Sequence, residues 1–274
     1  MPPVLTERRD RAFVVTINRP EARNAVNAEV AQLLFEAVEA FKADETLDAL
    51  ILTGAGDPSA GSRPGESPLA TGQAAFCAGA DLKGGAGLMA RPGAQESGPM
   101  GFSRITDVDK PAIAAVNGYC LAGGVELACW CDFRIADETS QFGILNRRWG
   151  VPLLDGGTQR LPRIVGLGNA LYLMETGVMI DARQAQRMGL VQEVVPKGAA
   201  LERGLELAKA ISTYPQLSLR NDRRAAIDGL ALPLPEGLEL ERRLHEASLG
   251  DPAMVEGLRR YAAGDRPPPP RGAV

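Results

Sequence analysis

Short apolar runs alternate with helical patterns over the first two thirds of the chain, and this alternation restricts the possible folds more than any other feature. The runs with the length and composition of strands are Phe13–Ile17, Leu50–Leu52, Ala112–Val116 and Asp132–Ala136. Ala28–Lys42 carries its apolar residues on one helical face behind Asn27, a suitable N-cap. A further helix, Val125–Trp130, is predicted after a glycine pair. Strands and helices in alternation predict an α/β fold with a layered core.

Helical patterns dominate the rest of the chain. Asp181–Gln184 has the form of a capping box, and Gly189 is placed to end that helix. Residues 199–263 are predicted to be mainly helical, and residues 264–274, which include a run of prolines, to be a disordered tail. Residues 1–198 would then form the core.

Two segments interrupt the alternation. Gly54–Gln73 and Gly84–Gly101 are rich in Gly, Pro and Ser, which predicts mobile loops. The first of them contains a long insertion at about residues 57–74, for which surface decoration is favoured over a role at the edge of a pocket.

Composition excludes several classes of function. With 30 basic and 34 acidic residues the net charge is -4, so no nucleic-acid partner is expected. The most apolar stretch, Pro111–Cys131, is interrupted by polar residues and glycines, so no membrane span is expected. The N-terminus lacks the apolar core of a signal peptide, and a cytoplasmic location is expected.

Metal and nucleophile chemistry find little support in the residue types. The chain has 4 cysteines, none in a C-x-x-C pair, and 1 histidine, His245. No metal site is therefore expected, and a Ser–His or Cys–His nucleophile pair is poorly supported. The cysteines lie in apolar surroundings, as expected of buried free thiols.

Two motifs are rich in small residues, which allow the backbone to approach a neighbouring group closely. One is Phe76–Leu82, and the other is Asn117–Leu127, in which Gly123 and Gly124 lead into a helix that carries Glu126 in its first turn. Free N–H groups at a helix start can hold a developing oxyanion while a nearby carboxylate moves a proton. The alternative is that the glycines only permit tight packing and that Glu126 is a helix-start charge. The residues alone leave both interpretations open.

The chain resembles the enoyl-CoA hydratase/isomerase, or crotonase, family over nearly its whole length. The blocks that carry the resemblance are Arg19–Ala25, Phe76–Leu82, Lys110–Gly118, Ala122–Glu126, Cys131–Asp132, Gly156–Leu161 and Ala185–Val191. It implies a spiral of β-β-α units, a helical C-terminal region used for assembly into a homotrimer or homohexamer, and an acyl-CoA thioester ligand. No cofactor is implied beyond the coenzyme A of the substrate.

The resemblance also implies roles for single residues. The two backbone N–H groups of the family's oxyanion hole fall on Ala78 and Gly123, and Glu126 matches one catalytic glutamate. Coenzyme A is expected along Ala78, Gly79, Ala80 and Asp81, with Arg23 and Ala25 near its phosphate and adenine end.

The second catalytic glutamate of the hydratases is replaced. An ungapped reading puts Asn146 at its position, and an amide does not exchange protons near neutral pH. Asp155 is a possible replacement; the alternative, which we favour, is that it caps the following helix. We therefore expect an acyl-CoA hydratase or isomerase that acts through a thioester enolate, on something other than simple straight-chain enoyl-CoA. The alternatives are another crotonase-fold reaction, such as hydrolysis, C–C cleavage or dehalogenation, and a non-catalytic acyl-CoA-binding protein.

Overall fold

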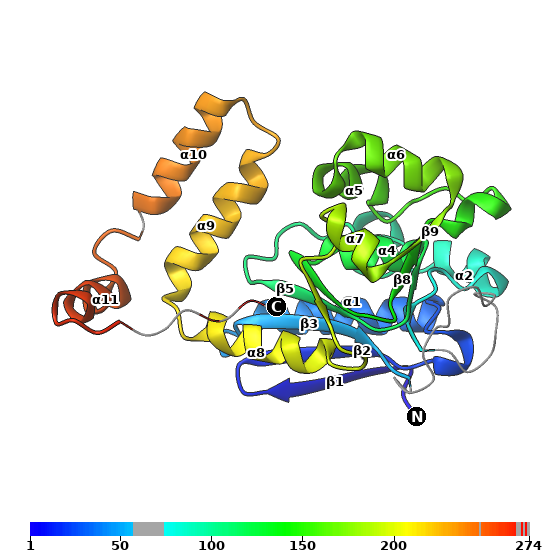
Figure 1. Ribbon diagram of the computed structural model, residues 1–274, viewed down its shortest axis with the longest axis horizontal. Coiled ribbons are helices and arrows are strands. Elements are labelled where there is room, and N and C mark those ends of the chain that lie inside the picture. The colour runs from blue at the N-terminus through cyan, green and yellow to red at the C-terminus, as the bar shows by residue number, and fades with distance from the viewer. Residues whose placement is uncertain (57–73, 247, 267–269, 271, 273–274) are drawn as a thin grey trace.

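Two β-sheets take their strands from the chain in alternation (Figure 1). The computed structural model describes residues 1–56, 74–246, 248–266, 270 and 272. The larger sheet has the order β1 (Val4–Arg9), β2 (Ala12–Ile17), β3 (Ala49–Gly54), β5 (Ala112–Val116), β7 (Phe133–Asp137), β10 (Glu193–Val195). The smaller sheet has the order β4 (Ala75–Cys77), β6 (Tyr119–Leu121), β8 (Gln141–Gly143), β9 (Met179–Asp181).

The chain crosses from the larger sheet to the smaller one in each successive turn, from β3 to β4, from β5 to β6 and from β7 to β8. Neighbouring strands are parallel except in the β1–β2 and β8–β9 pairs. This is the predicted α/β spiral, and the strands expected at residues 13–17, 50–52, 112–116 and 132–136 correspond to β2, β3, β5 and β7.

Helices cover both faces of the larger sheet and extend beyond it. The helices of the core are α1 (Ala28–Ala43), α2 (Gly85–Met89), α3 (Ala94–Ser97), α4 (Gly123–Trp130), α5 (Gly157–Val165), α6 (Leu167–Thr176), α7 (Ala182–Arg187) and α8 (Ala200–Ser212). Short 3-10 turns are η1 (Pro20–Ala22), η3 (Leu82–Gly84) and η4 (Leu145–Trp149). No helix in the described part of the chain is long and apolar enough to cross a membrane.

The capping residues behave as the sequence predicts. The Asn27 side chain accepts a hydrogen bond from the Val30 N–H at the start of α1. Asp181 and Gln184 form a reciprocal capping box at the start of α7, and Gly189 follows that helix with φ +81°. These local signals determine where two helices begin, whereas tertiary packing determines which surface each helix covers.

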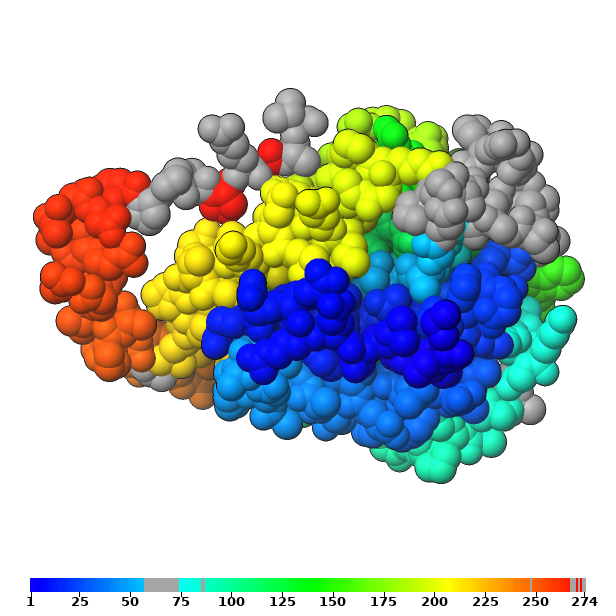
Figure 2. Space-filling model, turned by 90° about the horizontal axis from the view of Figure 1, so that it is seen from below, coloured from blue at the N-terminus to red at the C-terminus, as the bar shows by residue number. Residues whose placement is uncertain are grey.

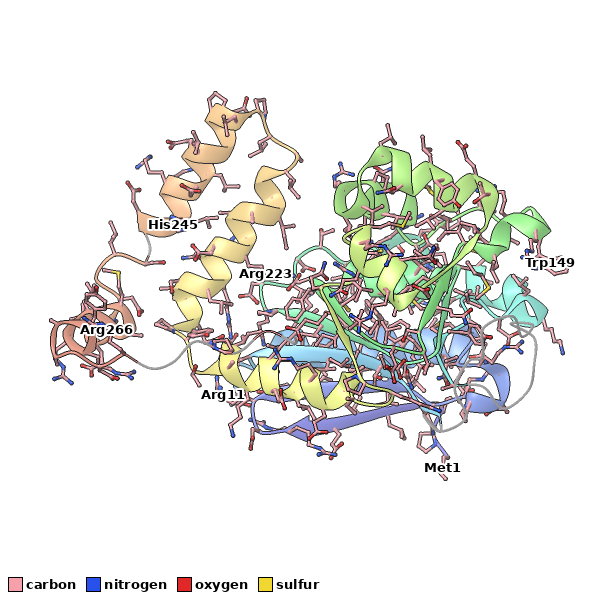
Figure 3. All side chains as sticks on the ribbon, viewed as in Figure 1. Met1, Arg11, Trp149, Arg223, His245 and Arg266 are labelled. Atoms are coloured by element: carbon pink, nitrogen blue, oxygen red, sulfur yellow. The ribbon has the colours of Figure 1, made fainter. Side chains whose placement is uncertain are left out.

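The C-terminal helices stand away from the sheets. They are α9 (Gln216–Gly229), α10 (Leu234–Glu246) and α11 (Pro252–Ala262), and none of their described residues is buried. Figure 1 and Figure 2 show them at one side of the molecule. Arg223, on the side of α9 that faces the core (Figure 3), pairs with Asp132 at 2.7 Å. The helical prediction for residues 199–263 is confirmed, while the proposed division of the chain stays a prediction.

The second predicted loop is ordered, contrary to the expectation of mobility. Residues 84–101 contain α2 and α3 and bury Leu88, Arg91 and Met100. Gly101, with φ +109°, lies so close to α1 that a Cβ there would be 2.4 Å from the Ala31 carbonyl oxygen. Gly101 thus serves close packing rather than mobility. The insertion at residues 57–73 and most of the predicted tail lie outside the described residues.

Candidate active site

The smaller sheet brings the two small-residue motifs together. Strands β4 and β6 are parallel neighbours, so residues that follow their carboxyl ends meet at one edge. Gly79 follows β4, and a Cβ there would lie 3.0 Å from the Gly123 nitrogen. Gly123 begins α4 directly after Ala122, which has φ +50°, an uncommon value for alanine. The turn presents the Gly123 N–H at the start of a helix, where an anion is favoured.

The structure corrects one of the two predicted oxyanion donors. The Ala78 N–H donates a 3.0 Å hydrogen bond to the Arg23 carbonyl oxygen, so it is already occupied. Ala80 bridges Val26 in parallel through the Gly79 carbonyl and the Asp81 N–H. In such a bridge the N–H of the central residue points away from the partner strand. The Ala80 N–H has no acceptor among the described residues and is the available donor beside Gly123.

The predicted coenzyme A segment lies beside the Arg23–Ala25 turn. Arg23 and Asn24 both have left-handed backbone, and the buried Asn24 side chain donates to the Ala75 carbonyl at 2.6 Å. Asp81 pairs with Arg19 at 3.2 Å, so its carboxylate is partly neutralised. The Arg23 side chain makes no hydrogen bond or ion pair within the described residues. The Arg23–Ala25 turn and the predicted coenzyme A segment are therefore adjacent, as the resemblance implies.

Glu126 is buried in the first turn of α4 and held by two backbone donors. Its Oε1 accepts hydrogen bonds from the Gly157 N–H at 2.8 Å and the Asp155 N–H at 2.9 Å. Burial raises the pKa of Glu126 to about 7, and the negative charge of Asp155 acts in the same direction. Oε2 makes no hydrogen bond to the described residues. A carboxyl group with this pKa can both accept and donate a proton near neutral pH.

Asp155 is not a helix cap, so the interpretation favoured from sequence is wrong. The N-cap of α5 is Gly156, and no side chain caps that helix. The buried Asp155 Oδ1 instead accepts hydrogen bonds from the Met100 N–H, at 2.9 Å, and from the Ser103 hydroxyl group. Burial raises the pKa of this carboxyl group. Asp155 therefore lies beside Glu126, to which its own N–H donates.

Asn146 is a buried residue of the η4 turn. Its Nδ2 donates to the carbonyl oxygen of Val151, just after the end of η4, at 2.6 Å. Its Oδ1 is buried and has no hydrogen-bond partner among the described residues. No hydrogen bond in the described structure joins Asn146 with Glu126. One hydrogen bond thus orients the Asn146 amide, and its Oδ1 can still accept another.

Sequence reasoning missed Ala80 as a donor, and it missed Met100 and Ser103 entirely. Met100 packs against the Ala122–Gly123 turn, since a Cβ on Gly123 would be 2.2 Å from its Sδ. Met100 belongs to the segment Gly84–Gly101, whose glycines suggested only a loop, and Ser103 follows that segment by two residues. Cys77, in the same motif as Ala80, is buried with its pKa raised to about 12, so its thiol is protonated. Among the described residues no cluster of three or more His, Cys, Asp or Glu is placed to hold a metal.

Comparison with known proteins decides the family. Residues 69–268 match the family model described as enoyl-CoA hydratase/isomerase. The chain belongs to the enoyl-CoA hydratase/isomerase family. It is 37% identical to a "Probable enoyl-CoA hydratase" of Rhizobium meliloti, over 95% of each protein. It is also 37% identical to a "Crotonyl-CoA hydratase" of Syntrophomonas wolfei, over 87% of this chain and 86% of that one.

The fold agrees with solved members of the enoyl-CoA hydratase/isomerase family. The enoyl-CoA hydratase EchA1 of Mycobacterium marinum superposes with a TM-score of 0.85 and 34% identity, covering 98% of both chains. The predicted crotonase fold and family of enzymes are thereby confirmed. The roles of the individual site residues rest on the geometry above.

Proposed function

We propose that the protein acts on enoyl-CoA thioesters through an oxyanion-stabilised enolate. The Ala80 and Gly123 N–H groups would hold the thioester oxygen, and Glu126 would move the proton. Two fixed donors are what a developing enolate oxygen needs, and each such donor is worth about 2.7–4 kcal/mol in other enzymes. The observation that carries the proposal is the buried Glu126, held by two N–H groups with its pKa raised to about 7.

Coenzyme A would lie along Ala78–Asp81, with the Arg23–Ala25 turn near its phosphate and adenine end. The free Arg23 side chain supports this placement, because a guanidinium group pairs readily with phosphate. The chemistry needs no cofactor beyond the coenzyme A that the substrate carries.

Asn146 limits hydration. Adding water to an alkene requires a proton at one carbon and an activated water at the other, and Asn146 can orient water but cannot take its proton. We therefore expect simple straight-chain enoyl-CoA, such as crotonyl-CoA, to be hydrated weakly. Migration of the double bond needs one group that removes a proton and returns it elsewhere. Glu126 alone could do this, so isomerisation is the second candidate.

The test is the Glu126→Gln variant. Glutamine keeps the acceptor for both N–H groups but exchanges no proton, so turnover of enoyl-CoA should fall about 10²–10⁴-fold. Calorimetry with a saturated CoA ester should show unchanged binding. Equal turnover by the wild type and the variant would exclude Glu126 as the acid/base, and no turnover of any enoyl-CoA by the wild type would exclude the hydratase/isomerase assignment.

A homotrimer or homohexamer is proposed for the assembly. Large apolar side chains are exposed on the three C-terminal helices, including Ile227, Leu234, Leu238, Val255, Leu258 and Tyr261. A cavity of about 780 Å³ separates α9 from the core, and Trp130, Ile164 and Leu230 line it. Glu126 does not line this cavity. Exposed apolar surface of this extent is typical of an interface between subunits.

A further inference from the structure

Asp155 contacts both halves of the catalytic site. Its backbone N–H donates to Glu126 Oε1 at 2.9 Å. Its side-chain Oδ1 accepts from the Met100 N–H, also at 2.9 Å, and from the Ser103 hydroxyl group. One residue therefore links the acid/base to the segment at residues 98–103.

That segment has little room to move. A Cβ on Gly98, which has φ +97°, would lie 2.0 Å from Ser103 Oγ and 3.1 Å from Asp155 Oδ1. On its other side Gly101 lies against the backbone of α1. The chain is thus held between α1 and Asp155 with a backbone shape that only glycine adopts without strain.

Met100 connects this fixed segment with Gly123, the proposed oxyanion donor. Its side chain is buried, and its Sδ lies where a Cβ of Gly123 would be 2.2 Å away. The thioether forms a wall of the turn that presents the Gly123 N–H. Loss of the Asp155–Met100 hydrogen bond would therefore change the position of the Gly123 N–H, where the thioester oxygen is expected to bind.

We propose that Asp155 is a positioning residue, which holds Met100 against Gly123 with its side chain and aims Glu126 with its backbone N–H. This inference rests on the proposed function. The role requires an acceptor at Oδ1 and no proton exchange, so asparagine should serve nearly as well as aspartate. It differs from the role of a second acid/base, which asparagine cannot fill.

The charges around the pair set the expected pH effect. Glu126 faces Asp155, Arg160 and the Cys129 thiol. Asp155 faces Arg91, Arg104, Arg160 and the Cys77 thiol. Asp155 raises the pKa of Glu126, whereas Arg160 lowers it. Removing the charge at position 155 should move the acidic limb of the pH–rate profile, which Glu126 governs, to lower pH.

The experiment compares Asp155→Asn, Asp155→Ala and Ser103→Ala in enoyl-CoA turnover over pH 5–9. Asn should keep kcat within about tenfold of the wild type, since only the charge assistance of two hydrogen bonds is lost. Ala should lower kcat about 10²-fold, the cost of a misplaced catalytic group, with KM for the CoA ester unchanged. Ser103→Ala keeps the hydrogen bond from the Met100 N–H to Asp155, so its kcat should lie between those of the other two variants. If Asn falls as far as Ala, by about 10²–10⁴-fold at every pH, Asp155 is an acid/base and the proposal is wrong.

Asp137→Asn is the matched control. Asp137 is also a buried aspartate, which accepts hydrogen bonds from Thr139, Ser140 and Gly198, and none of these donors belongs to the site. Its variant should leave the pH profile unchanged.

A measurement without turnover separates failure of this inference from failure of the proposed function. The infrared stretch of the thioester carbonyl in bound butyryl-CoA reports the hydrogen bonds on its oxygen. The shift seen in the wild type should persist in Asp155→Asn and shrink in Asp155→Ala. If the wild type turns over no enoyl-CoA, the proposed function fails, and this shift still decides the positioning role. Equal shifts in all three proteins would overturn it.

Discussion

Gly124 packs directly against the carbonyl oxygen of Cys77, so closely that a Cβ on Gly124 would lie 2.1 Å from that oxygen. Helix α4 thus approaches the end of β4 at a distance that only glycine permits. This contact sets the spacing between the helix that carries Glu126 and the strand that leads to Ala80.

We expect Gly124→Ala to be strongly destabilising. The clash is with backbone, which cannot rotate away, and overpacking of this kind costs about 1–3 kcal/mol. The matched control is Gly168→Ala, also near a helix start, where nothing lies within 4 Å of the added Cβ. Alanine there should stabilise the fold by up to about 1 kcal/mol. Urea unfolding of both variants tests this, and equal midpoints would contradict the close packing at Gly124.

Glu126→Gln should stabilise the protein at alkaline pH. The pKa of Glu126 is raised from 4.5 to about 7 in the folded state, so folding favours the protonated form. The contribution of this group to stability is present below pH 4.5 and is lost as the pH rises through about 7. At pH 8 the variant should be more stable by roughly 3 kcal/mol, and at pH 4.5 nearly equal to the wild type. A stability difference that stays constant between these pH values would argue against the raised pKa.

Asn146→Glu should raise the rate of crotonyl-CoA hydration by at least about tenfold if position 146 corresponds to the second catalytic glutamate of the hydratases. Initial rates follow from the loss of absorbance of the conjugated thioester. The substitution also removes the Asn146 bond to the Val151 carbonyl, so circular dichroism and CoA-ester binding must first be unchanged. A folded, binding variant with no gain, beside a wild type that already hydrates crotonyl-CoA rapidly, would show that the second acid/base lies elsewhere.

Light scattering at micromolar concentration should give the mass of a trimer or a hexamer. Replacing Leu238 and Leu258 by Glu should lower that mass, because both side chains are exposed on the C-terminal helices and burial of one leucine contributes about 1.5–3 kcal/mol. Leu5→Glu, on the edge strand β1, is the control and should leave the mass unchanged. A monomeric wild type would contradict the proposed assembly.

Local patterns in the sequence predict a large part of the fold. The apolar spacing of residues 28–42, the Asn27 cap and the Asp181 capping box each act within one or two helical turns, so they can be read without knowing the rest of the chain. Strands of three residues, such as β4, β6 and β8, were missed because so short a run carries no periodicity.

Family resemblance and spacing also predict that Glu126 and Gly123 belong to the site. The sequence by itself determined that the chain is an α/β protein with a glycine-led helix bearing a carboxylate, since these follow from residue types close together in the chain. Only the tertiary structure decided that Ala80 rather than Ala78 has a free N–H, because Arg23, 55 residues away in sequence (78 minus 23), occupies the other. It also decided that the Asp155 side chain does not cap α5 and instead accepts hydrogen bonds from Met100 and Ser103. Hydrogen bonds between distant segments depend on where the chain returns in space, and no local pattern of residues encodes that.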